Sequence, residues 1–296
     1  MSYIFILCFY LSQSRWINLA ISGLYLAISG PPGPRGRDAL NIFTWLPMSA
    51  LHMFHKNETY TYYCNTAEDG ILYKDKKPVG LKNQFGKFKR KSNGNKNAMC
   101  LQNFQQPVQL DSGYYGIFLK DSLYKISHVP AAFAPPSIMV VALSFRISAT
   151  LTDADHYIFT NNSISRGVAI SRNALNILGS QYRMELEYDV NDWNTLIIQY
   201  SFITEPGKDQ CIFILNGQEK GYFKLRYDKI QDKDIFIGGH PSKRNYGNVV
   251  LANFEIYNKI FDSKNVPSNY LLPDELFQAL NDDMNERINY GYNKLN

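Results

Sequence analysis

The stretch SIMVVALSFRI, residues 137–147, decides how the rest of the chain is interpreted. Every second residue from Met139 to Ile147 is apolar, and side chains two positions apart point to the same face of a β-strand. The stretch therefore predicts a strand with one face turned toward a core.

Runs of the same period lie on both sides of it. YRMELEYD (182–189) alternates apolar and charged residues, whereas NTLIIQYSF (194–202) and QCIFIL (210–215) are apolar on both faces, as inner strands are. In VVLANFEIY (249–257), one apolar stripe is expected from Val250 to Ile256, and Val249 and Leu251 begin the other. Asn216-Gly217 follows QCIFIL, and Asn-Gly is a strong hairpin signal because both residues accept positive φ. About a dozen short strands separated by turns predict an all-β fold, an antiparallel β-sandwich.

One helix is expected, at the C-terminus. Pro273, Asp274 and Glu275 suit a first helical turn, where proline needs no hydrogen-bond partner and carboxylates meet the helix dipole. Apolar residues then recur at helical spacing, at Leu276, Phe277, Leu280, Met284 and Ile288. This helix is expected to dock on the sandwich.

Composition and charge exclude some classes of protein. The 296 residues are 45% hydrophobic and 14% aromatic, which fits a globular β-protein with a core. The net charge is +5, but residues 56–97 alone hold ten Lys/Arg against four Asp/Glu. Because the basic excess sits in one segment, nucleic acid is not expected as a partner.

The first 55 residues contain two unusual segments. Residues 1–29 are apolar, and Ala27-Ile28-Ser29 fits a signal-peptidase site, so they predict a signal peptide, with an uncleaved signal anchor as the alternative. Unless that anchor is retained, no stable membrane span is expected. Residues 30–55 begin as GPPGPRGRD, three collagen-like Gly-X-Y triplets, and end the pattern at Ala39. Three triplets are too few for a triple helix, so we interpret residues 30–55 as a short collagen-like segment and linker.

The order of the central motifs resembles a laminin G-like, concanavalin A-like jelly roll. Trp193 opens a strand, Asn216-Gly217 ends a later one, Ile237-Gly238-Gly239 follows, and a last strand runs from Gly247 to Tyr257. The resemblance implies a jelly-roll domain over residues 98–270, preceded by a basic, loop-rich segment at 56–97. The C-terminal helix and tail occupy 271–296. Lectins, adhesion modules and polysaccharide hydrolases share this fold, so fold alone does not decide function.

The basic segment is one candidate binding surface. It interleaves aromatic and basic side chains, at Phe85, Lys87, Phe88, Lys89, Arg90 and Lys91. In an extracellular protein this pattern would bind sulfated glycosaminoglycan through charge. The alternative is a solvated loop.

A calcium site is a second candidate. Laminin G-like domains often hold Ca²⁺ at a sandwich rim, and LTDADHY places Asp153 and Asp155 two positions apart in a predicted loop. The alternative is an ordinary polar turn, and Ca²⁺ is the only cofactor that the sequence suggests.

An enzyme is not expected. The chain has no nucleophile elbow, zinc-binding helix motif, P-loop or dinucleotide fingerprint. Glu187-Tyr188-Asp189 comes close to the E-x-D-x-x-E strand of retaining hydrolases, but the last carboxylate is the shorter Asp192. A secreted jelly-roll glycoside hydrolase therefore stays the alternative.

The remaining candidates are a disulfide and two glycosylation sites. Cys64 and Cys100 flank the basic segment and are expected to form a disulfide, whereas Cys211 is expected to be a core thiol. Asn57 and Asn161 begin Asn-x-Ser/Thr glycosylation sequons. These features favour a secreted, extracellular-matrix-type protein that binds glycans or matrix proteins without catalysis. The alternatives are the hydrolase and a purely structural matrix component.

Overall fold

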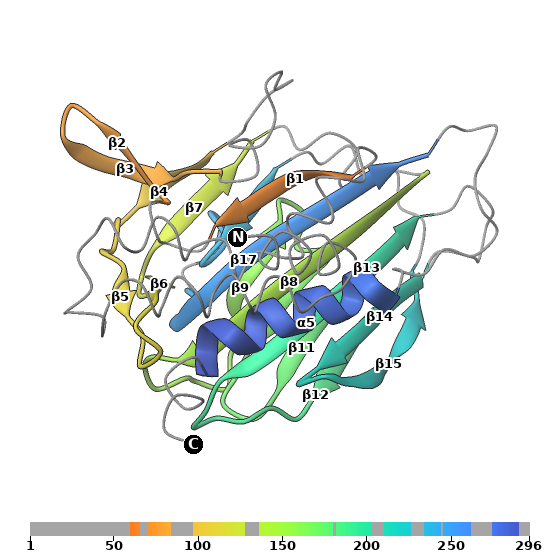
Figure 1. Ribbon diagram of the computed structural model, residues 1–296. Helices are drawn as coiled ribbons and strands as arrows, with labels where there is room; N and C mark the ends of the chain where they lie inside the picture. The colour runs from red at the N-terminus through yellow and green to blue at the C-terminus, as the bar shows by residue number, and fades with distance from the viewer. Residues whose placement is uncertain are drawn as a thin grey trace, which may run out of the picture. The chain divides into compact units, whose positions relative to one another are not determined.

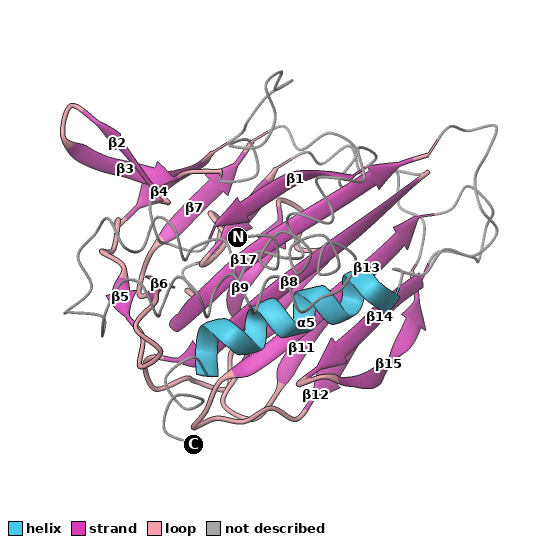
Figure 2. Ribbon diagram, viewed as in Figure 1, coloured by secondary structure: helices cyan, strands magenta, loops and turns pink. Residues whose placement is uncertain are grey.

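The computed structural model describes residues 60–65, 70–83, 97–127, 136–179, 182–202, 210–225, 234–243, 245–261 and 274–289. All of them belong to one compact unit, Leu46–Asn296. They form two antiparallel sheets and one C-terminal helix, which confirms the predicted fold class (Figures 1 and 2). No helix in these ranges is long and apolar enough to cross a membrane. The predicted signal and collagen-like segments lie outside the described residues.

The first sheet, sheet A, holds the longest strands. Strand β17 pairs with β8 along most of its length and with β1 and β6 on its other side. The order across the sheet is β15 (Gln218–Lys224), β14 (Gln210–Leu215), β13 (Asn194–Phe202), β8 (Ser137–Ile147), β17 (Val249–Ile260), β6 (Tyr115–Phe118) and β5 (Val108–Gln109), with β1 (Tyr60–Asn65) also on β17.

The second sheet, sheet B, consists of shorter strands. Its order is β12 (Tyr182–Leu186), β11 (Leu175–Gly179), β10 (Arg166–Ile170), β9 (His156–Asn161), β16 (Ile235–Ile237), β7 (Leu123–Ile126), β4 (Ala98–Gln102), β3 (Lys77–Leu81) and β2 (Ile71–Lys74). Strands β9 to β12 are antiparallel neighbours in sequence order, so this part of the sheet is built by local connections.

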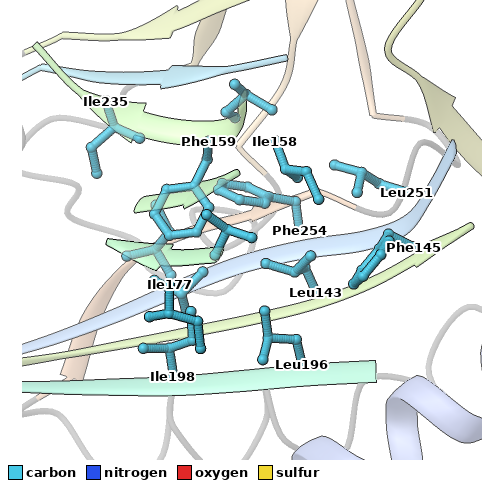
Figure 3. Packing of buried hydrophobic residues seen from close by; sticks show 14 of the residues in the cluster. Leu143, Phe145, Ile158, Phe159, Ile177, Leu196, Ile198, Ile235, Leu251 and Phe254 are labelled. Atoms are coloured by element: carbon cyan, nitrogen blue, oxygen red, sulfur yellow. The ribbon is translucent and has the colours of Figure 1, made fainter. Parts of the chain in front are cut away.

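The core lies between the two sheets (Figure 3). Leu143 and Phe145 of β8 point into it, as the alternation in residues 137–147 predicted. Phe159 of sheet B meets Phe254 of sheet A edge-to-face, with 5.6 Å between ring centroids. Burying each such side chain stabilises the fold by roughly 1.5–3 kcal/mol, so this contact holds the two layers together.

Strand β17 departs from the predicted pattern. Up to Leu251 its inward residues are odd-numbered, and from Phe254 onward they are even-numbered. Its register against β8 shifts between Leu251 and Asn253, where a β-bulge adds one residue. The stripe predicted from Val250 to Ile256 is therefore wrong in its first half, because the bulge reverses the alternation and places Val249 and Leu251 on the core face with Phe254 and Ile256.

The predicted C-terminal helix is confirmed as α5 (Asp274–Asn289). It lies along the outer face of sheet A, over β8, β13 and β17 (Figure 1). Leu276, Leu280 and Met284 pack there on Ile138 and Val140, the alternate residues of β8. Strand β8 is consequently buried on both faces.

A buried arginine joins the end of α5 to sheet A. Arg287 is 1% exposed, and its Nε donates a hydrogen bond to the Ala252 carbonyl at 2.9 Å. Its Nη2 donates to the Tyr115 carbonyl at 3.2 Å, and its guanidinium carbon lies 4.9 Å from the centroid of the Tyr114 ring. The contacts connect α5 to both β17 and β6.

A buried carboxylate belongs to the same interface. Glu255 on β17 accepts a hydrogen bond from Asn253 Nδ2 at 3.0 Å and another from the Tyr257 hydroxyl. Burial raises the pKa of Glu255, while these two hydrogen bonds and the charge of Arg287 lower it part of the way back. Asp283 of α5 is also buried. The helix thus covers charged as well as apolar groups.

The sandwich includes strands that the sequence did not predict. Strands β1, β2 and β3 lie within residues 56–97, which were interpreted as a basic, loop-rich segment. The Asn216-Gly217 turn was predicted correctly, since both residues have positive φ, 53° and 73°, between β14 and β15.

Candidate functional site

The candidate site lies on the outer face of sheet B, on β11, β12 and the loop that precedes β9. We call it the rim cluster: Asp155, Asn176, Arg183 and Glu185. Asn176 of β11 lies directly opposite Glu185 of β12. The intervening residues of both strands point into the core, so alternation leaves Asn176, Arg183 and Glu185 on the outer face. Asp155 comes immediately before β9.

Three of these side chains form a closed hydrogen-bonded ring. Arg183 Nη1 donates to Asp155 Oδ2 at 2.8 Å, and Arg183 Nε donates to Asn176 Oδ1 at 2.7 Å. Asn176 Nδ2 closes the ring with a longer contact to Asp155 Oδ1 at 3.4 Å. Arg183 Nε also lies 3.4 Å from Glu185 Oε1. The guanidinium plane is therefore fixed by its neighbours.

The ring is half open to solvent. The side chains of Arg183 and Asp155 are 40% and 22% exposed, whereas Asn176 is fully buried. An ion pair so exposed contributes only about 1 kcal/mol or less to stability. None of the contacts above uses Arg183 Nη2, which leaves donors available beside two carboxylates. The ring is thus better suited to binding a polar ligand than to stabilising the fold.

Buried apolar residues adjoin the ring. Ala169 lies opposite Asn176 on one side and opposite Tyr157 on the other, so these residues form one row with Glu185 across the outer face. Tyr157, Ala169 and Leu178 form a small buried cluster. Lys243 Nζ lies 6.0 Å from the Tyr157 ring centroid. Tyr157 is 3% exposed and Ala169 is fully buried, so this row leads from the ring into a buried cluster.

Two histidines fix the loops beside this row. His156 Nδ1 lies 2.8 Å from the Tyr246 carbonyl, and its Nε2 lies 2.8 Å from Thr152 Oγ1. His240 Nε2 lies 2.8 Å from the Asn162 carbonyl oxygen. Because both rings have neighbours at both nitrogens, their role is to position loops.

The predicted calcium ligands face arginines. Asp155 is held by Arg183, and Asp153 Oδ1 lies 3.8 Å from Arg172 Nη1. No group of three or more acidic, histidine or cysteine side chains suited to a metal occurs in the described part of the chain. The structure pairs Asp155 with Arg183 and brings Asp153 near Arg172, and the Ca²⁺ site expected there stays a prediction.

The carboxylates behind the hydrolase alternative lie beyond a strand. Strand β12 ends at Leu186, before Glu187 and Asp189. Asp189 Oδ1 accepts hydrogen bonds from the backbone N–H groups of Asn191 and Asp192, at 2.8 and 3.2 Å. Asp189 therefore stabilises a turn, and the strand geometry on which that alternative depended is not formed.

The Asn161 sequon is buried. Asn161 is 0% exposed, and its Oδ1 accepts hydrogen bonds from the backbone N–H groups of Ser165 and Arg166. Its Nδ2, the atom that would carry a glycan, donates to the hydroxyls of Ser163 and Ser165. The predicted glycosylation of Asn161 is therefore wrong for the folded protein. Asn57 lies outside the described residues.

The cysteines do not pair as predicted. Cys100 on β4 of sheet B is a free thiol, and Cys64 is on β1 of sheet A. The expected Cys64–Cys100 disulfide is therefore wrong. Cys211 is a buried core thiol, as predicted, and burial raises its pKa well above the ordinary value. The binding residues predicted at 85–91 lie outside the described residues.

Sequence reasoning missed Asn176 and missed the role of Arg183. Alternation correctly predicted that Arg183 is on the solvent-facing side of its strand, but it did not predict that Asp155 lies beside it. The available signal was the pair of outward polar residues on strands joined by a short turn.

Comparison with known proteins does not assign the chain to a family. No protein-family model matches the sequence, and no curated protein matches it. Similar solved structures include one of botulinum neurotoxin type C, whose cell entry depends on interaction with two ganglioside molecules, with 14% identity and a TM-score of 0.47. The binding domain of Paraclostridial Mosquitocidal Protein 1 shows 13% identity and a TM-score of 0.45. The alignments cover 77% and 68% of this chain.

This chain spans about half the length of those structures, 53% and 51%. At such identities and TM-scores the likeness transfers neither a site nor a ligand. The β-sandwich itself follows from the strand pairing described above, and the laminin G-like resemblance stays a prediction.

Proposed function

We propose that the protein is a secreted, extracellular-matrix-type protein that binds glycans without catalysis, through the rim cluster. The observation that carries the proposal is the closed Asp155–Asn176–Arg183 ring, which is fixed internally and half open to solvent.

The chemistry of the ring matches that of a sugar. Adjacent hydroxyls of a sugar each donate and accept hydrogen bonds, and recognition needs donors and acceptors at fixed neighbouring positions. The ring places guanidinium donors next to carboxylate acceptors. Because its members already hold one another, little side-chain entropy is lost when a ligand binds.

Secretion rests on the sequence alone. The signal-like residues 1–29 and the collagen-like triplets after them support an extracellular location. If the anchor is retained, the same binding surface is displayed at a membrane.

The test is a glycan-array measurement on the full chain with a matched pair of variants. Arg183→Gln removes the central donor of the ring, and we expect glycan affinity to fall about tenfold to a hundredfold, the range for a hydrogen bond to a charged group. Arg172→Gln is the control, because Arg172 is exposed on the same rim and its guanidinium lies 3.8 Å from Asp153, outside the Asp155–Asn176–Arg183 ring. The control should bind like the wild type.

Other results contradict the proposal. Salt-sensitive binding to heparin that is unchanged in Arg183→Gln would move the site to Phe85–Lys91. Turnover of a polysaccharide would restore the hydrolase alternative, and failure to bind any glycan would favour a protein partner or a structural role.

A further inference from the structure

A second surface lies at the opposite edge of sheet B, on the β2–β3 hairpin and the adjoining strand β4. Lys74 and Lys77 are directly opposite each other, and Asp75 and Lys76 form the two-residue turn between them. Both turn residues have positive φ, 50° and 63°, which matches the twist of the flanking strands. In Figure 1 this turn is at the outer end of the hairpin, away from the other strands.

The charge at this turn opposes the stability of the hairpin. Lysines directly opposite each other in an antiparallel pair destabilise it, and Lys76 adds a third positive charge next to them. All three side chains are exposed, and Asp75 is the one acidic residue among them. A negatively charged ligand would relieve this repulsion.

Large apolar side chains accompany the lysines. Five large hydrophobic residues are exposed among those that the structure describes, and three of them are on these strands: Tyr73 (56%), Met99 (43%) and Leu101 (52%). Met99 lies opposite Gly80, which in turn lies opposite Leu72. Met99 and the half-buried Leu72 therefore share the outer face of this edge with Lys74, whereas alternation places Tyr73 on the opposite face.

We propose that the β2–β3–β4 edge binds the surface of an anionic lipid bilayer. Such a surface supplies both chemistries: acidic headgroups attract the lysines, and the interface below them accepts apolar side chains. A soluble polyanion would satisfy the lysines but would leave Met99 and Leu101 in water. The proposal goes beyond the proposed function, since this edge and the rim cluster use different strands.

The experiment measures binding of the full chain to phosphatidylcholine vesicles with and without phosphatidylserine. The readout is the increment that phosphatidylserine causes, so apolar binding by residues 1–29 cancels. Lys74→Gln/Lys77→Gln should lose about fivefold in affinity for each lysine, roughly twenty-five-fold together. The matched control is Arg172→Gln/Lys224→Gln, two exposed basic residues next to strands at the far ends of sheets B and A, which should lose far less.

A second variant separates lipid from polyanion. Met99→Ser/Leu101→Ser keeps every charge, and we expect it to lose about tenfold in vesicle affinity while heparin binding is unchanged. Two results would overturn the proposal: no increment with phosphatidylserine, or an increment that the control pair reduces as much as Lys74→Gln/Lys77→Gln. Heparin binding without dependence on Met99 and Leu101 would assign the edge to a polyanion instead.

Discussion

Replacing Arg287 with methionine should lower the free energy of unfolding, because the variant removes a buried positive charge beneath α5. Methionine keeps most of the apolar stem of the side chain and removes the guanidinium. The variant loses the hydrogen bonds to the Ala252 and Tyr115 carbonyls and the contact with the Tyr114 ring. It also removes a positive charge that lowers the pKa of Glu255.

The expected loss is worked from those contacts. Two hydrogen bonds from a charged donor are worth about 1.5–3 kcal/mol each, and removal of the buried guanidinium returns part of its desolvation cost. The net loss in the free energy of unfolding should be about 3–5 kcal/mol, the usual cost of breaking a buried charge network by removing one partner. A domain with a total stability of roughly 5–15 kcal/mol would be visibly weakened.

The loss should depend on pH, with a defined sign. The pKa of Glu255 is raised in the folded state, so its contribution to stability is present below the unfolded pKa and is lost as the pH rises through the folded pKa. Without Arg287 that pKa rises further. The variant should therefore be more strongly destabilised at about pH 8 than at about pH 4, where Glu255 is neutral.

Urea unfolding followed by circular dichroism at both pH values measures this. The double variant Arg287→Met/Glu255→Gln should lose most of the pH dependence. Arg146→Met is the control, because Arg146 is 38% exposed and stacks on Trp193, and its loss should be about 1 kcal/mol or less. A loss for Arg287→Met that is equal at both pH values would refute the charge coupling to Glu255.

Three further predictions follow from single sites. Asn161→Ala should lower the free energy of unfolding by about 2–4 kcal/mol, because two buried backbone N–H groups lose their acceptor. Mass spectrometry of the native protein should find residue 161 unglycosylated, and a glycan there would contradict the buried geometry. A thiol reagent should modify half-buried Cys100 in the folded protein, faster as the pH rises because the reactive thiolate forms, with the increase moved to higher pH by the raised pKa of Cys100. It should reach Cys211 only after unfolding, and equal rates would contradict the burial. Adding Ca²⁺ or a chelator should leave the melting temperature unchanged, since Asp153 and Asp155 face arginines, and a clear shift would support the calcium site.

The strands and the helix were predictable where the signal is local. Alternation identified β8 and the wet face of β12, and helical spacing with Pro273 identified α5. The bulge in β17 was not predictable, because one extra residue reverses the alternation and nothing in the local sequence marks it. Strand β1 was missed because its partner is nearly two hundred residues away, Tyr60 pairing with Lys259.

The rim cluster shows the same limit for a site. The sequence singled out Asp153 and Asp155, two acidic residues in one predicted loop, as calcium ligands. What sits beside Asp155 is Arg183, twenty-eight residues later, brought there by the register of three strands. Register depends on turns and bulges across the sheet, so the contact between Asp155 and Arg183 could not be predicted from the sequence around either residue.

The most direct test of the account is the glycan affinity of the full chain, compared between wild type, Arg183→Gln and Arg172→Gln on the same array. The account predicts that a glycan bound by the wild type is lost about tenfold or more by Arg183→Gln and is retained by Arg172→Gln. Equal binding by all three proteins would contradict it, because the ring would then take no part in recognition.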